Sequence, residues 1–204
     1  MLFLTNGPLP FAIVAFLLGA IPFGYVVGKL RGVDVRQSGS GNIGATNVSR
    51  TMGWQTGVLV LVLDALKVAV PTWTLWWFTG RQQAGVIMAV AGMLGHVFSP
   101  FVGFRGGKGV ACLLGAMLVL QPLATGICMA AFVGIMAASR LVSLGSLAAA
   151  VVLPVALLLL HQPGYLVMFG VFAAILVLFT HRANIARLRN GTEPKFGQPA
   201  STER

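Results

Sequence analysis

The stretch WQTGVLVLVLDALKVAVPTWTLWWF, residues 54–78, decides the fold of this 204-residue chain. It is long enough to cross a membrane, because a helix needs about 20 residues to span the hydrocarbon core. Its only charged residues are Asp64 and Lys67. The rest of the chain is similar, with 57% hydrophobic and 9% charged residues overall. This composition excludes an ordinary soluble domain and predicts an all-α integral membrane protein.

Seven apolar stretches predict seven transmembrane helices, of which the fourth is short. They cover residues 11–30, 54–78, 83–101, 110–120, 123–138, 142–160 and 165–180. The fourth and fifth, separated by Gln121 and Pro122, form either two full crossings or one re-entrant hairpin. Both arrangements give the same later topology. We expect one transmembrane domain over residues 1–197 and a disordered cytoplasmic tail over residues 198–204.

The basic residues predict the orientation of these helices. No Lys or Arg precedes the first apolar stretch, whereas a secretory signal peptide begins with basic residues. We therefore expect an uncleaved first helix with its N-terminus outside. All Lys and Arg residues except Lys67, in a span, and Arg81, in an outer loop, then lie on the cytoplasmic side. This is the bias expected of cytoplasmic loops, and it explains the net charge of +10 without nucleic acid.

Three polar islands interrupt the apolar sequence, and the predicted topology places all three on the cytoplasmic face. They read SGSGNIGATNVSR at residues 38–50, GHVFSPFVGFRGGKG at residues 95–109 and HRANIARLRNGTE at residues 181–193. Glycine backbones, amide and hydroxyl side chains, Lys and Arg are the groups that bind phosphate. The islands therefore predict a phosphate-bearing substrate handled at the membrane surface.

The first island combines flexible glycines with donors at Ser40, Asn42, Thr46 and Asn47, and with the planar fork of Arg50. The alternative interpretation is a flexible loop with a helix cap.

The second island resembles a Walker A loop but fails as one, since Gly109 replaces the hydroxyl residue that would hold Mg²⁺. Its glycines followed by Lys108 still suit a phosphate site before a helix. Alternatively, Arg105 and Lys108 are ordinary basic anchors and His96 is a polar residue near the interface.

The third island predicts a polar stripe if the seventh helix continues, because His181, Asn184 and Arg187 are three residues apart. The alternative is a basic helix end that snorkels to the interface. Asp64 and Lys67 have i, i+3 spacing, which favours a structural ion pair over a role in a substrate pathway.

In this order and spacing, the three islands resemble the motifs of the bacterial acyl-phosphate:glycerol-3-phosphate acyltransferases. LDALK at residues 63–67 and RLVSLGS at residues 140–146 extend the resemblance over nearly the whole chain. The family implies a seven-helix protein of the bacterial inner membrane with its active site facing the cytoplasm. It implies transfer of a long-chain acyl group from acyl phosphate to glycerol 3-phosphate, giving lysophosphatidic acid and inorganic phosphate.

The resemblance also implies a set of site residues. Its catalytic members are His181, Lys108, Arg50 and Ser40. Its substrate-binding members are Ser40, Gly41, Asn42, Gly44, Thr46, Asn47, Arg50, Gly106, Gly107, Lys108, Ser146, His181, Asn184, Arg187 and Glu193. No cofactor and no metal are implied. The implied partners are membrane lipids and the enzyme that supplies acyl phosphate, with no nucleic acid.

Direct transfer without an acyl-enzyme fits the absence of a Gly-x-Ser-x-Gly nucleophile elbow. The hydroxyl proton would go to His181 or to the acyl phosphate itself, and the resemblance favours the second. Two other functions fit the same basic residues: a transporter of a small phosphorylated anion and a lipid-binding subunit without activity. A transporter site is expected near the bilayer midplane, where only Asp64 and Lys67 lie.

Overall fold

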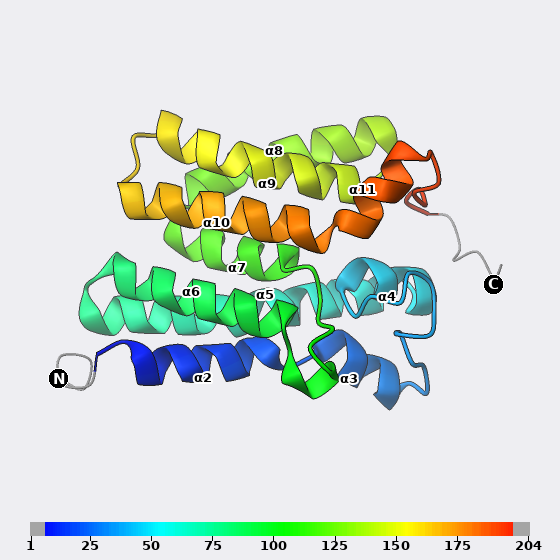
Figure 1. The fold of residues 1–204 in the computed structure, drawn as a ribbon, viewed down its shortest axis with the longest axis horizontal. Helices are drawn as coiled ribbons and strands as arrows, with labels where there is room; N and C mark the ends of the chain where they lie inside the picture. Colours follow the sequence, from blue (N-terminus) through cyan, green and yellow to red (C-terminus); the bar gives the residue numbers. More distant parts are fainter. Residues whose placement is uncertain (1–6, 198–204) are drawn as a thin grey trace. The chain divides into compact units, whose positions relative to one another are not determined.

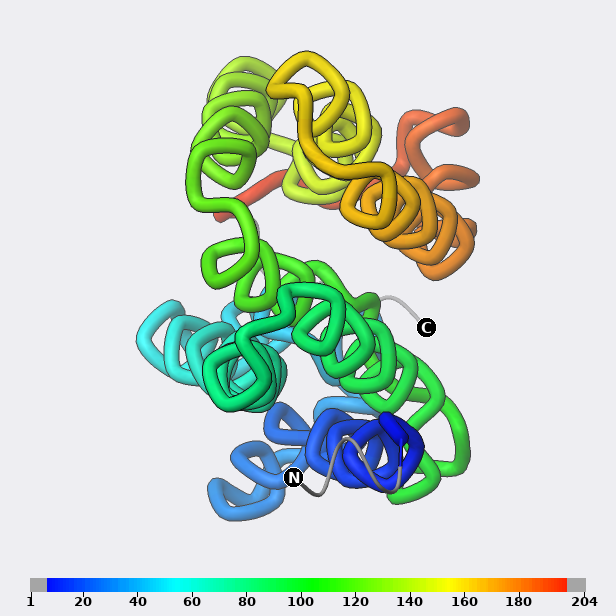
Figure 2. Tube along the Cα trace, turned by 90° about the vertical axis from the view of Figure 1, so that its left-hand side faces the viewer, coloured from blue at the N-terminus to red at the C-terminus, as the bar shows by residue number. Residues whose placement is uncertain are grey.

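The computed structural model describes residues 7–197, and all regular secondary structure in this range is helical (Figure 1). The chain forms two compact units, one up to Leu120 and one that begins at Gln121. Figure 2 traces the chain as a tube, with the first unit coloured from blue to green and the second from green to red. The tail predicted at residues 198–204 lies outside the described residues.

Within residues 7–197, the first unit contains six α-helices and a 3₁₀ turn, and the second unit contains four α-helices. In the first unit these are α2 (Leu9–Ala20), α3 (Phe23–Leu30), α4 (Ala45–Met52), α5 (Trp54–Thr79), α6 (Gln82–Val97), η1 (Pro100–Val102) and α7 (Val110–Leu120). In the second they are α8 (Pro122–Ser139), α9 (Val142–Leu159), α10 (Gly164–Thr180) and α11 (Arg182–Arg189).

Within residues 7–197, five stretches are long and apolar enough to cross a membrane, and α10 with α11 would make a sixth. These stretches include α2 with α3 as one span, α5, α6 with η1, α8 and α9. The short fourth helix was predicted correctly at residues 110–120. Its 11 residues extend only about 16 Å at 1.5 Å per residue, about half of the hydrocarbon core.

The first predicted span is broken where a continuous helix was expected. Helix α2 ends at Ala20 and α3 begins at Phe23, because Pro22 has no N–H and cannot continue the hydrogen-bond ladder. The break exposes two backbone carbonyls inside an apolar helix. Ser99 donates its hydroxyl to the Ala20 carbonyl at 2.6 Å, and Lys67 donates its ammonium to the Ile21 carbonyl at 2.7 Å. Side chains of other elements therefore stabilise this break.

The third predicted span, residues 83–101, ends earlier than expected as an α-helix. Helix α6 stops at Val97, shortly before Pro100, and the chain continues through η1. A proline disfavours helical geometry at the residue before it, which explains the early end.

The sequence patterns missed helix α4, which was expected to be loop. It occupies the second half of the first island, and Gly44 precedes it in an extended conformation. The seventh predicted helix does not continue straight into the third island either. Helix α11 is bent by 62° from α10.

Small residues let the helices of the first unit pack closely. A Cβ on Gly19 of α2 would overlap the backbone of Gly92 on α6, and one on Gly115 of α7 would overlap the backbone of Ala65 on α5. Direct backbone contact of this kind is the usual role of glycine in membrane helices.

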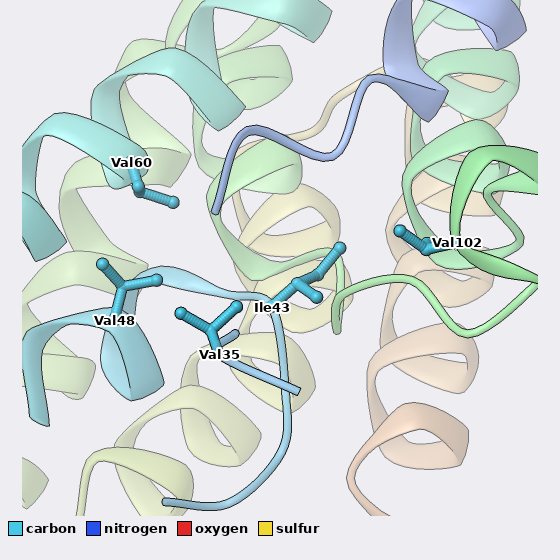
Figure 3. Packing of buried hydrophobic residues seen from close by; sticks show 5 residues of the cluster. All are labelled: Val35, Ile43, Val48, Val60 and Val102. Atoms are coloured by element: carbon cyan, nitrogen blue, oxygen red, sulfur yellow. The ribbon is translucent and has the colours of Figure 1, made fainter. Parts of the chain in front are cut away.

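A separate apolar cluster lies beneath the first two islands (Figure 3). It consists of Val35, Ile43, Val48, Val60 and Val102. Val35, Ile43 and Val48 flank or belong to the first island, while Val102 belongs to the second and Val60 to α5. The cluster therefore anchors both polar segments on the same helix.

Candidate phosphate-binding site

Asn47 holds the first island in shape. Its Nδ2 donates to the carbonyls of Val35, Ser38 and Asn42 at 2.8–3.0 Å. Its Oδ1 accepts the backbone N–H of Ser40 at 2.8 Å. The side chain is 2% exposed, so all of its hydrogen-bonding groups serve the loop. The structure thus places this predicted ligand as a residue that positions the island.

Two glycines of the island adopt conformations that other residues rarely reach. Gly39 and Gly41 have φ values of 60° and 70°. A Cβ on Gly39 would also overlap Oδ1 of Asn47. The Asn42 side chain accepts the N–H of Gly44 at 2.9 Å, an Asx turn that leads into α4. These contacts fix the backbone path between α3 and α4.

The remaining predicted ligands of this island lie around that fixed backbone. Ser40, Gly41 and Thr46 are exposed, while Asn42, Gly44 and Arg50 are half-buried. Exposed hydroxyl and backbone groups beside an Arg are suitable for an anion. Arg50 lies in the last turn of α4, the helix that Asn47 connects to the loop.

A charged clamp outside the membrane spans braces the start of the first island. Arg36 donates from Nε and Nη2 to the Asp34 carboxylate at 3.0 and 2.8 Å, and its guanidinium stacks 4.3 Å from the Tyr25 ring centroid. The side-chain hydrogen bond from Arg36 is the main reason that the pKa of Asp34 lies well below its usual range.

The second island is a compact turn between α6 and α7. The N–H groups of Gly106 and Gly107 donate to the carbonyls of Val97 and His96, both at 3.1 Å. Gly109 has φ 84° and directly precedes α7. Lys108 is therefore held, half-buried, between a glycine turn and the first turn of a helix, where anions are favoured.

The ion pair predicted within the second span is present. Lys67 Nζ lies 2.8 Å from Asp64 Oδ1, and both side chains are nearly inaccessible. Lys67 Nζ is also 2.9 Å from His96 Nδ1. His96 is thus a buried partner of Lys67, which differs from the interfacial position considered from the sequence.

In the second unit, the third island turns at His181. Its Nδ1 is 2.8 Å from the carbonyl oxygen of Val177. Because a carbonyl only accepts, Nδ1 carries the proton, and Nε2 is the basic nitrogen of the neutral ring. His181 is 3% exposed.

Glu193 binds two predicted ligands of the third island. Asn184 Nδ2 donates to its Oε1 at 2.6 Å, and Arg187 Nε donates to its Oε2 at 2.7 Å. Burial of the carboxyl raises its pKa, but interactions with the side chains of Ser143, Asn184 and Arg187 outweigh burial and lower it. The carboxylate therefore orients both side chains.

Two further contacts organise the second unit. Ser146 is buried on α9 and donates its hydroxyl to the Val142 carbonyl at 2.9 Å. Arg140, at φ 62°, accepts the N–H of Phe196 through its carbonyl at 2.7 Å. The segment after α11 is thereby attached to the turn between α8 and α9. No local pattern indicated this role for Arg140, which shares the RLVSLGS motif with Ser146.

The predicted site residues fall into two groups, one in each unit. The first unit brings together the ligands of the first and second islands over their shared apolar cluster. The second unit brings together His181, Asn184, Arg187 and Glu193 around α11. No group of three or more His, Cys, Asp or Glu side chains suited to a metal occurs within residues 7–197.

These features define a polytopic helical membrane protein with glycine-rich, basic anion-binding segments. The protein-family model described as glycerol-3-phosphate acyltransferase matches residues 9–191. The chain belongs to the glycerol-3-phosphate acyltransferase family.

Relatives with that name share much of the sequence. The one from Trichlorobacter lovleyi is 44% identical over 182 residues, covering 89% of this chain and 94% of the relative. The one from Crocosphaera subtropica is 41% identical over 203 residues, covering 94% of each.

Two crystal structures of PlsY (YgiH), an integral membrane glycerol 3-phosphate acyltransferase, share the fold. Its glycerol 3-phosphate form has a TM-score of 0.89 and 38% identity, and the alignment covers 94% of this chain and 96% of that one. Its lysophosphatidic acid form has a TM-score of 0.86 and 37% identity over the same shares. The all-helical integral membrane fold predicted from the sequence is thereby confirmed.

The Glu193 contacts predict a pH-dependent contribution to stability. The folded pKa lies below the ordinary value of 4.5, so the contribution is complete above that value and is lost as the pH falls through the folded pKa. We expect Glu193→Gln to destabilise the protein by about 1–3 kcal/mol at pH 7. The difference from wild type should shrink in thermal unfolding below pH 4.5.

Thr192→Ala, a change at the exposed neighbouring residue, serves as the control and should match wild type at every pH. An equal loss from Glu193→Gln at pH 7 and at pH 3 would contradict the assignment.

Proposed function

We propose that this protein transfers a long-chain fatty acyl group from acyl phosphate to the sn-1 hydroxyl of glycerol 3-phosphate. The products are lysophosphatidic acid and inorganic phosphate, as in the first acylation of bacterial phospholipid synthesis. One observation carries the proposal: the fold matches PlsY in both its glycerol 3-phosphate form and its lysophosphatidic acid form, over nearly the whole chain. One form holds the acceptor of such a transfer and the other its product.

The chemistry needs positioning and charge neutralisation more than a nucleophile. An acyl phosphate is a mixed anhydride with a good leaving group. The acceptor oxygen bonds to the carbonyl carbon while the bond from that carbon to the phosphate oxygen breaks. We assign neutralisation of phosphate to Ser40, Arg50 and Lys108. Orientation supplies about 7–11 kcal/mol in such reactions, and donors at the developing oxyanion supply about 3–4 kcal/mol each.

The alcohol-binding role falls on the third island. We assign His181, Asn184 and Arg187 to glycerol 3-phosphate, with Glu193 holding the last two in place. In the favoured mechanism the hydroxyl proton passes to the departing phosphate, so transfer is direct and substrate-assisted. His181 is the alternative base, and its neutral Nε2 suits that role.

The remaining predicted ligands complete the assignment. Backbone and side-chain groups at Gly41, Asn42, Gly44, Thr46, Gly106, Gly107 and Ser146 bind substrate, and Asn47 acts through the loop that it holds. The donor set is one of hydroxyls, amides, Lys and Arg, which requires no metal or cofactor. Acyl chains would lie against lipid-facing helices.

We also propose seven membrane helices, with the N-terminus outside and the active site facing the cytoplasm of the bacterial inner membrane. Residues 1–197 act as one acyltransferase domain, since the family match spans both compact units. Helix α7 is too short to cross the hydrocarbon core by itself. In this topology α7 and α8 are the fourth and fifth helices, and the two together return the chain to the side from which α7 starts.

Activity is tested with purified protein in lipid, supplied with palmitoyl phosphate and glycerol 3-phosphate without added metal. We expect phosphate release that depends on glycerol 3-phosphate, formation of lysophosphatidic acid, and no product from palmitoyl-CoA. Lys108→Met should lower kcat/KM by about 100-fold or more, because a charged donor to phosphate is lost. The neighbouring Arg105→Gln, at an exposed residue, should retain activity within about threefold.

A folded wild-type preparation without turnover would exclude the enzyme and direct attention to glycerol-phosphate uptake in proteoliposomes. Labelled inorganic phosphate should not enter palmitoyl phosphate when glycerol 3-phosphate is absent. Such exchange would instead indicate an acyl-enzyme.

The orientation predicts opposite labelling of two exposed glutamines. Gln37 lies in the first island's leading loop and Gln83 in the first turn of α6. In spheroplasts, a membrane-impermeant maleimide should react with Gln83→Cys and should reach Gln37→Cys only after lysis. Both substitutions are made with Cys112 and Cys128 replaced by Ala. Labelling of Gln37→Cys in intact spheroplasts would invert the topology.

A further inference from the structure

Three buried ionisable side chains of the first unit have no part in the chemistry assigned above. Asp64, Lys67 and His96 are 2%, 8% and 3% exposed. Charged groups inside membrane proteins are costly and usually have a specific role. His96 belongs to the second island, so the role of these residues is sought there.

The ammonium of Lys67 makes three close polar contacts, two of them hydrogen bonds and one an ion pair. Its Nζ lies 2.7 Å from the Ile21 carbonyl, 2.8 Å from Asp64 Oδ1 and 2.9 Å from His96 Nδ1. An ammonium group donates hydrogen bonds and cannot accept them. His96 Nδ1 therefore accepts, and the proton of its neutral ring lies on Nε2. The ring is held in one orientation by a pair of charges on α5.

The opposite edge of that ring lies against the second island. A Cβ added to Gly107 would overlap Nε2 and would come within 2.6 Å of Cε1. One added to Gly106 would overlap the His96 carbonyl. The N–H of Gly107 donates to that same carbonyl at 3.1 Å. The ring and the backbone of His96 thus both determine the path of the chain immediately before Lys108.

We propose that His96, held in place by Lys67 and Asp64, is a positioning residue for Lys108. It supports the Gly106–Gly107 turn from inside the helix bundle, so that the Lys108 ammonium is presented to the phosphate group at a fixed place. This inference rests on the proposed role of Lys108. It gives the predicted LDALK motif a function, because that motif supplies the two charges that fix the ring.

A packing role without positioning makes a different prediction. If the three residues only stabilised the bundle, replacing His96 would loosen α2, α5 and α6 generally and leave the kinetics of folded molecules unchanged. If His96 positions Lys108, the effect is concentrated at residues 106–109 and appears in substrate binding. Hydrogen exchange and steady-state kinetics separate the two.

The first variant is His96→Asn in the full-length protein, compared by amide hydrogen exchange in lipid. Asn keeps an acceptor near the position of Nδ1 and removes the ring edge that faces Gly107. We expect amides of residues 106–109 to exchange about tenfold faster, while the rest of α5 and α6 stays close to wild type. Thr72→Val is the matched control. Thr72 is fully buried on α5, and its hydroxyl has no hydrogen-bond partner within residues 7–197, so this variant should leave the exchange at residues 106–109 unchanged.

The second variant, Gly107→Ala, disturbs the same contact from the other side without substituting Asp64, Lys67 or His96. For both variants we expect KM for the phosphate substrate bound by Lys108 to rise about 10- to 100-fold, with a smaller change in kcat. Raising the palmitoyl phosphate and the glycerol 3-phosphate concentrations separately shows which phosphate is affected. If His96→Asn does not fold, Gly107→Ala must show the local exchange and the KM effect by itself.

Unchanged exchange at residues 106–109 in a folded variant would overturn the proposal. So would an increase spread evenly over α2, α5 and α6 with wild-type KM. Loss of the proposed function would be recognised separately, because the wild type would then show no turnover. The exchange pattern would still decide whether His96 holds the turn.

Discussion

The buried ammonium of Lys67 is the contact on which the arrangement of the first unit depends. It donates to a backbone carbonyl at the break of the first span and to His96 at the end of α6, and it forms an ion pair with Asp64 on its own helix. Unpaired polar groups are costly where water is absent. One side chain thus donates a hydrogen bond to a carbonyl at the helix break, neutralises a carboxylate and orients an imidazole. At the same break, the Ser99 hydroxyl donates a hydrogen bond to the neighbouring Ala20 carbonyl.

The polar islands are built on this apolar framework as rigid segments. In the first island, the Asn47 side-chain amide forms hydrogen bonds with backbone groups that a helix or sheet would otherwise pair. In the third, Glu193 holds Asn184 and Arg187. Preorganised donors of this kind favour transfer chemistry, because little reorganisation is needed when charge develops. The residues that position ligands are therefore as informative as the ligands themselves.

Much of the fold followed from the sequence, since apolar length is a strong signal in a membrane protein. The limits of α7, α8, α9 and α10 were predicted within one or two residues. The break at Pro22 was missed because its compensation comes from Lys67 and Ser99, which are distant in sequence. Helix α4 was missed because its sequence is polar and rich in residues typical of loops. Both depend on tertiary contacts that local patterns do not contain.

The site was predictable in composition, but the roles within it were not. Short motifs identified the three islands, and family membership is shown by the match over residues 9–191. Spacing indicated an ion pair between Asp64 and Lys67, which is present. No local pattern indicated that His96 would join that pair, or that Asn47 would bond to four backbone groups of its own loop. Such assignments require the folded geometry.

The most direct test of this account is the thermal unfolding of Lys67→Met beside the double variant Asp64→Asn/Lys67→Met in one detergent. Removing one partner of a buried pair costs about 3–5 kcal/mol, because the other charge stays unpaired. We expect a large loss of stability in the single variant. The double variant should recover part of it, and only part, since the hydrogen bond from Lys67 to the Ile21 carbonyl is still lost. A wild-type unfolding midpoint for Lys67→Met would contradict the central role of this contact.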